Sequence, residues 1–122
     1  MISNPTIEDV GYKAHVDLMK YVDSNKLDYV VLDATFLLKN PEGVLRKLCK
    51  ACGIAFDPNM LEWTSGSRSE DGVWAKYWYH NVHRSKGYQS YKEKTDPFPK
   101  HLMPLLKECE RYYSILQSKA LN

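Results

Sequence analysis

The sequence predicts a mainly α-helical fold with about four to five helices around one short β-strand. Three observations support this prediction: apolar residues recur at helical spacing, one short run is rich in β-branched residues, and capping residues mark the starts and ends of the later helices. The 122 residues, 43% of them hydrophobic, are enough for a core. We therefore expect a single domain over residues 1–122.

The first predicted helix covers residues 7–22. Its apolar side chains fall on one helical stripe, with Asp and Lys between them: Ile7, Val10, Ala14, Leu18, Tyr21 and Val22. Thr6 can cap this helix, because its hydroxyl can accept a hydrogen bond from an amide of the first turn. Gly11 weakens the helix by about 1 kcal/mol relative to Ala, and the polar residues 23–26 end it.

Residues 29–32 predict a strand, because Tyr-Val-Val-Leu is a short apolar run rich in β-branched residues. The run does not alternate polar and apolar side chains, which is typical of a strand covered on both faces in a parallel sheet. No second segment of comparable strength is found. Since one strand cannot satisfy its own backbone groups, we expect it to pair with a second subunit, to be covered by helices, or to belong to a fragment.

Capping residues delimit the next helix. Asn40 is a helix cap, Pro41 fits the first helical position, and Gly53 is the expected stop. The apolar face between them is formed by Val44, Leu45, Leu48, Cys49 and Cys52. In the same way, Asp57 can cap a short helical turn and Pro58 fits its first position.

Two further helices are expected in the second half of the chain. Asp71 can cap a helix over about residues 73–83 that Gly87 ends, and residues 88–99 read as an extended loop. The last helix has an apolar stripe of Leu102, Leu106, Cys109, Tyr113 and Leu116. Pro104 should kink that helix near its start or separate a leading turn.

Charge and hydropathy exclude several classes of protein. The formal charge is +2, from 17 basic and 15 acidic residues, so dedicated nucleic-acid binding is not expected, and binding of a single nucleic-acid strand is a weaker alternative. No apolar run reaches the length of roughly 20 residues that a membrane span needs, so we expect no membrane association. Residues 1–5 lack the pattern of a secretion signal. Three reduced cysteines are expected, in a cytoplasmic protein.

Catalytic and metal-binding motifs are weak. Cys49 and Cys52 match C-x-x-C, but they end a helix, where the dipole opposes a thiolate, and buried apolar cysteines are the expected state. His80 and His83 lack a third metal ligand, so we predict no metal site. The sequence contains neither G-x-x-x-x-G-K-[ST] nor G-x-S-x-G, and we name no catalytic residue.

The stretch from Trp74 to Lys94 is the most informative part of the sequence. It contains six large aromatic residues and five cations, and Glu93 is its one acidic residue. Rings beside cations suit a base or sugar with a phosphate, through stacking and charge-assisted hydrogen bonds. The alternative is that the rings fill a small core while the lysines stay solvated.

Several segments resemble a known family. Residues 31–33 lead into Leu37-Leu38-Lys39-Asn40-Pro41-Glu42-Gly43-Val44-Leu45-Arg46-Lys47-Leu48-Cys49, followed by Gly53-Ile54-Ala55-Phe56-Asp57-Pro58-Asn59-Met60-Leu61. These segments are similar to the carboxy-terminal half of the sulfotransferase-like family of P-loop proteins. Residues 70–79 and 83–88 resemble a bacterial and plant branch of it, whose plant members are sometimes labelled branched-chain aminotransferase-like.

The resemblance implies a P-loop α/β fold whose sulfotransferases use 3′-phosphoadenosine 5′-phosphosulfate. The half that holds the phosphosulfate loop and the catalytic base is missing here, so the chain is expected to be a truncated subdomain. A late Arg-Lys-Gly segment of the family contacts the 3′-phosphate of the cofactor, and Arg84, Lys86 and Gly87 are a loose analogue. Trp74 and Tyr88 join them as candidate cofactor-binding residues.

The resulting hypothesis is a non-catalytic interaction or ligand-binding module that self-associates as a homodimer. No cofactor is expected beyond a residual site for a 3′-phosphoadenosine nucleotide. The alternative is a fragment or subunit of a sulfotransferase that needs a P-loop-bearing partner.

Overall fold

A computed structural model describes residues 4–122; Met1–Ser3, the start of the segment that lacks a signal pattern, lie outside the described residues. Within these residues the protein has seven α-helices, two short 3₁₀ turns and one pair of short strands, which confirms the mainly α prediction. The chain divides into two compact units. The first contains the residues up to Asp33 and Glu93–Leu121, and the second contains Ala34–Lys92 and Asn122. The single domain stays a prediction.

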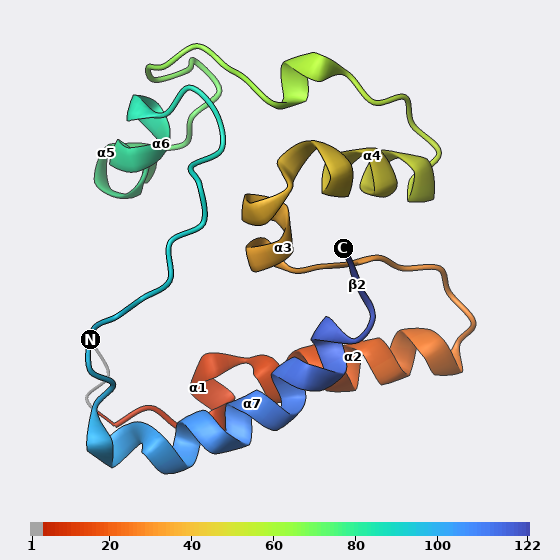
Figure 1. Ribbon diagram of the computed structural model, residues 1–122, viewed down its shortest axis with the longest axis vertical. Helices are drawn as coiled ribbons and strands as arrows, with labels where there is room; N and C mark the ends of the chain where they lie inside the picture. The colour runs from red at the N-terminus through yellow and green to blue at the C-terminus, as the bar shows by residue number, and fades with distance from the viewer. Residues whose placement is uncertain (1–3) are drawn as a thin grey trace. The chain divides into compact units, whose positions relative to one another are not determined.

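The first unit is built on two helices that lie side by side, α2 and α7 (Figure 1). Its elements in chain order are α1 (Ile7–Val10), α2 (Tyr12–Ser24), β1 (Val31–Leu32), η2 (Lys100–Leu102), α7 (Met103–Gln117) and β2 (Ala120–Leu121). The ring of Tyr12 on α2 packs edge-on against Tyr113 on α7, with centroids 6.1 Å apart. Val16 and Met19 on α2 and Cys109 on α7 are buried.

The first predicted helix is divided in two at Gly11. This residue has φ +76°, a left-handed conformation that glycine adopts without steric cost. The prediction of the apolar face was wrong: Val16 and Met19 are buried, whereas Leu18 and Tyr21 are exposed. The physical reason is that α2 starts afresh at Tyr12, so its packed stripe follows Tyr12, Val16 and Met19 at helical spacing.

Thr6 and Asp9 share the start of α1. The backbone N–H and the hydroxyl of Thr6 both donate to the Asp9 carboxylate, at 2.8 and 2.9 Å. The Thr6 side chain in turn accepts from the backbone of Asp9, so Thr6 caps the helix as predicted. This reciprocal bonding is a capping box.

The predicted strand over residues 29–32 is present only at Val31–Leu32, and it has a partner in its own chain. β1 pairs in parallel with β2, in a register that places Val31 opposite Ala120 and Leu32 opposite Leu121. The expectation of a single strand was therefore wrong, because Ala120 and Leu121 are too few to give a periodic signal. Leu32 is also 44% exposed, so the strand is not covered on both faces.

Two polar clusters hold the β1–β2 pair against the helices. The Tyr113 hydroxyl donates to the buried Asp33 carboxylate, which follows β1, at 2.6 Å, and Gln117 donates to Tyr113 at 2.7 Å. Lys119 donates to Asp23 at 3.0 Å and to the Tyr29 hydroxyl at 2.9 Å. Both clusters join segments that are far apart in sequence, and they fix where β2 leaves α7.

The second unit is centred on α3 (Ala34–Lys39) and α4 (Pro41–Ala51) (Figure 1). As predicted, the Asn40 side chain accepts from the Gly43 N–H at 3.1 Å and Pro41 opens α4. Gly53 stops the helix with φ +68°, and the N–H of Ile54 donates to the Cys49 carbonyl at 2.9 Å. This is the hydrogen bond of a Schellman motif.

The rest of the second unit consists of the 3₁₀ turn η1 (Pro58–Met60), α5 (Ala75–Trp78) and α6 (His80–Arg84). The Asp57 side chain caps η1 by accepting from the Asn59 N–H at 2.9 Å. The predicted helix over residues 73–83 is interrupted at Tyr79, and Asp71 does not cap it. Gly87 does not end it either, because Ser85 already takes an extended conformation.

The last helix and the extended segment before it match the prediction closely. No regular element lies between Arg84 and Lys100 within the described part of the chain, apart from a single bridge at Gly87. Pro104 sits in the first turn of α7, directly after the leading turn η2. A proline in the first turn loses no intrahelical hydrogen bond, so the leading turn is the alternative that the structure adopts.

Candidate functional site

Residues 83–88, which include four of the predicted cofactor-binding residues, are held by the segment around Trp63. The Trp63 N–H donates to the Lys86 carbonyl at 3.1 Å, and the Trp63 indole donates to the Ser85 hydroxyl at 2.9 Å. The Gly66 N–H donates to the His83 carbonyl at 2.7 Å. The backbone of this segment is therefore fixed by contacts to a part of the chain some 20 residues earlier.

Gly87 is required by packing against this same segment. It forms an isolated antiparallel bridge with Glu62, and a Cβ atom at this position would lie 2.9 Å from the Leu61 carbonyl oxygen. Real Cβ atoms do not approach backbone oxygens so closely. The structure thus gives Gly87 a backbone role, and its predicted contact with a cofactor stays a prediction.

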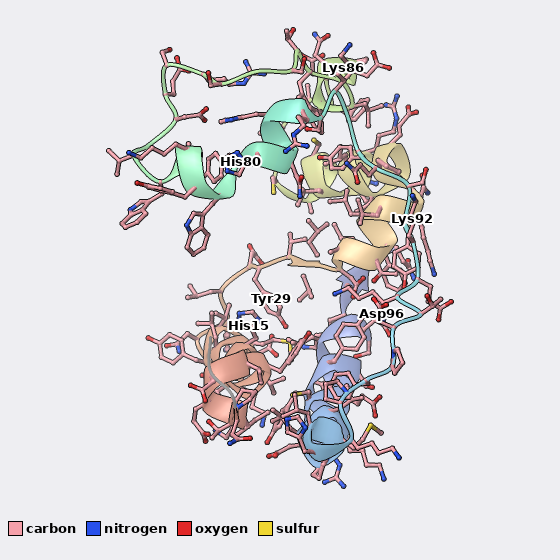
Figure 2. All side chains as sticks on the ribbon, turned by 90° about the vertical axis from the view of Figure 1, so that its left-hand side faces the viewer. His15, Tyr29, His80, Lys86, Lys92 and Asp96 are labelled. Carbon is pink, nitrogen blue, oxygen red and sulfur yellow. The ribbon has the colours of Figure 1, made fainter. Side chains whose placement is uncertain are left out.

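Arg84 and Lys86 are the two cations on this anchored segment. Both residues are exposed, and neither has an ion-pair partner among residues 4–122. Figure 2 shows Lys86 on the segment that follows α6 and leads on to Lys92. Between Gly72 and Lys92 the sequence has four cations, Lys76, Arg84, Lys86 and Lys92, and no Asp or Glu. A stretch of this charge is suited to an anion.

Trp74 and Tyr88 lie against different partners. Tyr88 is half-buried and packs edge-on against the Trp63 ring, with centroids 5.4 Å apart. Trp74 is 68% exposed and tilts by 52° against Tyr77. Trp78 is 77% exposed on the same short helix. The interpretation that these rings fill a core is therefore wrong for Trp74, Tyr77 and Trp78, whereas Tyr88 is half-buried against Trp63.

A pair that sequence reasoning did not single out lies beside α5 and α6. His83 Nε2 lies 2.8 Å from the Asp71 carboxylate, and both side chains are about one-fifth exposed. The Arg68 backbone N–H also donates to this carboxylate, at 2.8 Å. This N–H is the main cause that lowers the pKa of Asp71 below its ordinary value, and His83 adds to the effect while burial opposes it.

The Asp71–His83 pair lines a pocket of about 440 Å³ within the second unit. Its other polar walls come from Ser67 and Lys76, and its apolar walls from Val73 and Ala75. This size falls within the range of small-molecule sites, roughly 300–1,000 Å³. Asp71 and His83 are 12 residues apart, so no local spacing rule could have joined them.

The three cysteines lie in different environments. Cys49 and Cys109 are buried as predicted, but Cys52 is exposed, and all three are free thiols. Cys52 caps the end of α4, where its side chain has already turned from the packed face. Across residues 4–122, no group of three or more His, Cys, Asp or Glu side chains could hold a metal ion. Every helix of residues 4–122 is too short or too polar to span a membrane.

Comparisons with known proteins identify relatives by sequence. A family model described as the sulfotransferase domain matches residues 4–120. The chain is 39% identical over 87 residues to branched-chain-amino-acid aminotransferase-like protein 2 of Arabidopsis thaliana, and 43% identical over 88 residues to protein 1 of the same name. These matches cover 71% and 72% of the chain, but 16% of each relative. No solved structure matches the chain.

Proposed function

The chain belongs to the family of sulfotransferase domains, and from this premise we propose that it is a non-catalytic module that binds an anionic aromatic ligand. The proposed ligand is a 3′-phosphoadenosine nucleotide, held by Arg84 and Lys86 with Trp74 as a stacking ring. One observation carries the proposal: the backbone of residues 83–88 is fixed by the Trp63 segment, while the two cations on it have no partner among the described residues.

A fixed backbone matters because it lowers the cost of binding. Ordering a flexible loop around a phosphate would cost conformational entropy, whereas Arg84 and Lys86 only need to order their own side chains. A guanidinium and an ammonium can then form charge-assisted hydrogen bonds to phosphate oxygens. The exposed Trp74 ring offers one face to a base, because Tyr77 leans against it at an angle.

A calorimetric titration with 3′-phosphoadenosine 5′-phosphate tests this site. Arg84→Ala and Lys86→Ala should each weaken binding by about tenfold, the loss of one hydrogen bond to a charged group. Lys92→Ala removes the same charge from the extended segment after the anchored residues, and we expect a much smaller effect. If both substitutions leave the affinity unchanged, Arg84 and Lys86 do not bind the ligand.

The proposal places the chain at the carboxy-terminal half of the family fold. Residues 1–122 contain no G-x-x-x-x-G-K-[ST] pattern, and this backbone cradle is what binds a polyphosphate in P-loop proteins. We therefore expect no sulfuryl transfer from 3′-phosphoadenosine 5′-phosphosulfate by residues 1–122 alone. Measured turnover by the purified chain, above that of an Arg84→Ala, Lys86→Ala double variant, would show that the module is an enzyme.

A second candidate function is a part of an active sulfotransferase that works with a P-loop-bearing partner. The family match over residues 4–120 favours it, as does the length of the Arabidopsis relatives, of which the chain spans 16%. The discriminating observation is whether a neighbouring reading frame encodes a strand, a glycine-rich loop and a helix. A frame without these elements leaves the non-catalytic module as the better account.

We also propose self-association, through opposite charges and not through the pairing of strands that the sequence suggested. β1 pairs with β2 inside the chain, so a strand-to-strand dimer is no longer required. The four cations of residues 72–92 exceed the formal charge of +2, which leaves the remainder of the chain net negative. The net negative remainder of a second copy has the opposite charge to this basic stretch and can associate with it.

Light scattering at low and at high salt tests self-association. Association through opposite charges should weaken as salt screens them, and Lys76→Glu should weaken it further at low salt. A molar mass equal to that of one chain under both conditions would remove self-association from the proposal. The ligand site does not depend on that outcome.

A further inference from the structure

The pocket beside α5 and α6 contains polar groups that the proposed nucleotide site does not use. Neither Arg84 nor Lys86 lines it; its walls come from the loop that contains Ser67 and Asp71, from α5 and from His83. The question is therefore which ligand this separate set of groups would recognise.

Two groups that can donate hydrogen bonds line the pocket without a polar partner among residues 4–122. The Ser67 hydroxyl forms no hydrogen bond there, and the Lys76 ammonium forms no ion pair. His83 uses Nε2 as the donor to Asp71, so the other nitrogen of the neutral ring is an acceptor. Lys76 instead lies over the Tyr77 ring, with its nitrogen 4.9 Å from the ring centroid. Such a contact leaves the ammonium able to donate to another acceptor.

The one acid of the pocket is already satisfied. The same oxygen of Asp71 accepts from the Arg68 N–H and pairs with His83, each at 2.8 Å. Both of these hydrogen bonds use the Asp71 carboxylate, so it needs no partner from a ligand. Lys76 is the cation of fixed charge among the described residues that line the pocket, and together with the Ser67 hydroxyl it can bind an anion through charge-assisted hydrogen bonds.

The remaining walls are small or apolar. Val73 and Ala75 supply the apolar part, and Gly72 has open space where a Cβ would lie. A ligand that fills about 440 Å³ can carry a ring or short hydrocarbon body as well as its charged group. We infer that this pocket binds a small organic anion, with its carboxylate or sulfonate-type group toward Lys76 and Ser67 and its apolar body against Val73. This inference does not rest on the proposed nucleotide site.

Benzenesulfonate is a suitable probe, because it combines a fixed negative charge with an apolar ring. Calorimetry on the full chain should show saturable binding, and Lys76→Gln should weaken it by about tenfold, the effect of losing one charge-assisted hydrogen bond. Lys92→Gln is the matched control, since it removes an exposed lysine that does not line the pocket. We expect its affinity to equal that of the unchanged protein.

Three comparisons make the result decisive. Benzyl alcohol, which has the ring without the charge, should bind far more weakly, and inorganic sulfate, which has the charge without the ring, should do the same. Equal binding of either would overturn the assignment of an organic anion, as would a Lys76→Gln variant with unchanged affinity. The Arg84→Ala, Lys86→Ala double variant should retain benzenesulfonate binding, so a failure of the nucleotide site would leave this result unaffected.

Discussion

The helix α4 and the α5–α6 pair both have apolar residues at helical spacing, but only α4 buries them. Val44, Leu45 and Cys49 are buried on α4, whereas Trp74, Tyr77 and Trp78 around α5 are exposed. Cys49 lies 3.8 Å from the Met60 sulfur of the following turn, so a nearby segment of the chain covers the face of α4. The comparison teaches that apolar periodicity predicts a helix, while burial depends on whether another element reaches that face.

The ends of the two regions differ in the same way. α4 has its own cap at Asn40, a proline in its first turn and a glycine stop. The short helices α5 and α6 have no side-chain cap, and α6 is held by the Asp71–His83 pair and the bonds to the Trp63 segment. The stability of α4 is therefore local, whereas that of α6 depends on contacts across the second unit.

The largest expected difference between the two regions concerns core packing. Val44 is 0% exposed and Val73 is 78% exposed. Val44→Ala should lower the free energy of unfolding by about 2–3 kcal/mol, because it removes buried methyl groups and leaves a cavity. Val73→Ala should change it by less than about 0.5 kcal/mol. Urea titrations of the two variants measure both values, and equal losses would contradict the packing contrast.

A smaller difference is expected at the helix ends. Asn40→Ala removes the acceptor of the Gly43 N–H and should cost about 1 kcal/mol of stability. Asn81→Ala, an exposed position on α6 without a capping role, is the matched control and should be close to neutral. A similar loss in both variants would show that capping is not what distinguishes α4.

The smallest expected effect is a pH dependence that is larger at α6 than at α4. The pKa of Asp71 is lowered in the folded protein, so its contribution to stability is present above the ordinary carboxyl value of 3.8 and is lost as the pH falls below it. Hydrogen-exchange protection of α6 amides should therefore fall more on acidification than that of α4 amides, which serve as the internal control. Equal falls would mean that the Asp71–His83 pair does not hold α6.

The features of the fold that could be predicted are those that depend on residues close together in the sequence. The Asn40 cap, the Gly53 stop, the Asp57 cap and the leading turn before α7 all follow from the chemistry of neighbouring residues. The buried face of α2 was assigned to the wrong stripe, because the break at Gly11 changes which residues pack and both stripes have helical spacing.

The candidate site was predicted only in part. Arg84 and Lys86 were identified from their charge and from a family resemblance, and the structure gives them an exposed position on a fixed backbone. Trp63, Ser85 and Asp71 were missed. Each acts through a partner 12 or 22 residues away, and a single sequence contains no periodic signal for such pairs.

The sequence by itself determined the helical class, the caps and stops of α4, and the basic, acid-free run from Gly72 to Lys92, because these depend on residue chemistry and short-range spacing. The tertiary structure alone decided that β1 pairs with β2, that Gly87 faces the Leu61 carbonyl, and that His83 meets Asp71 at a pocket. Those contacts join residues that are distant in the chain, and only packing in three dimensions selects one such pairing among many.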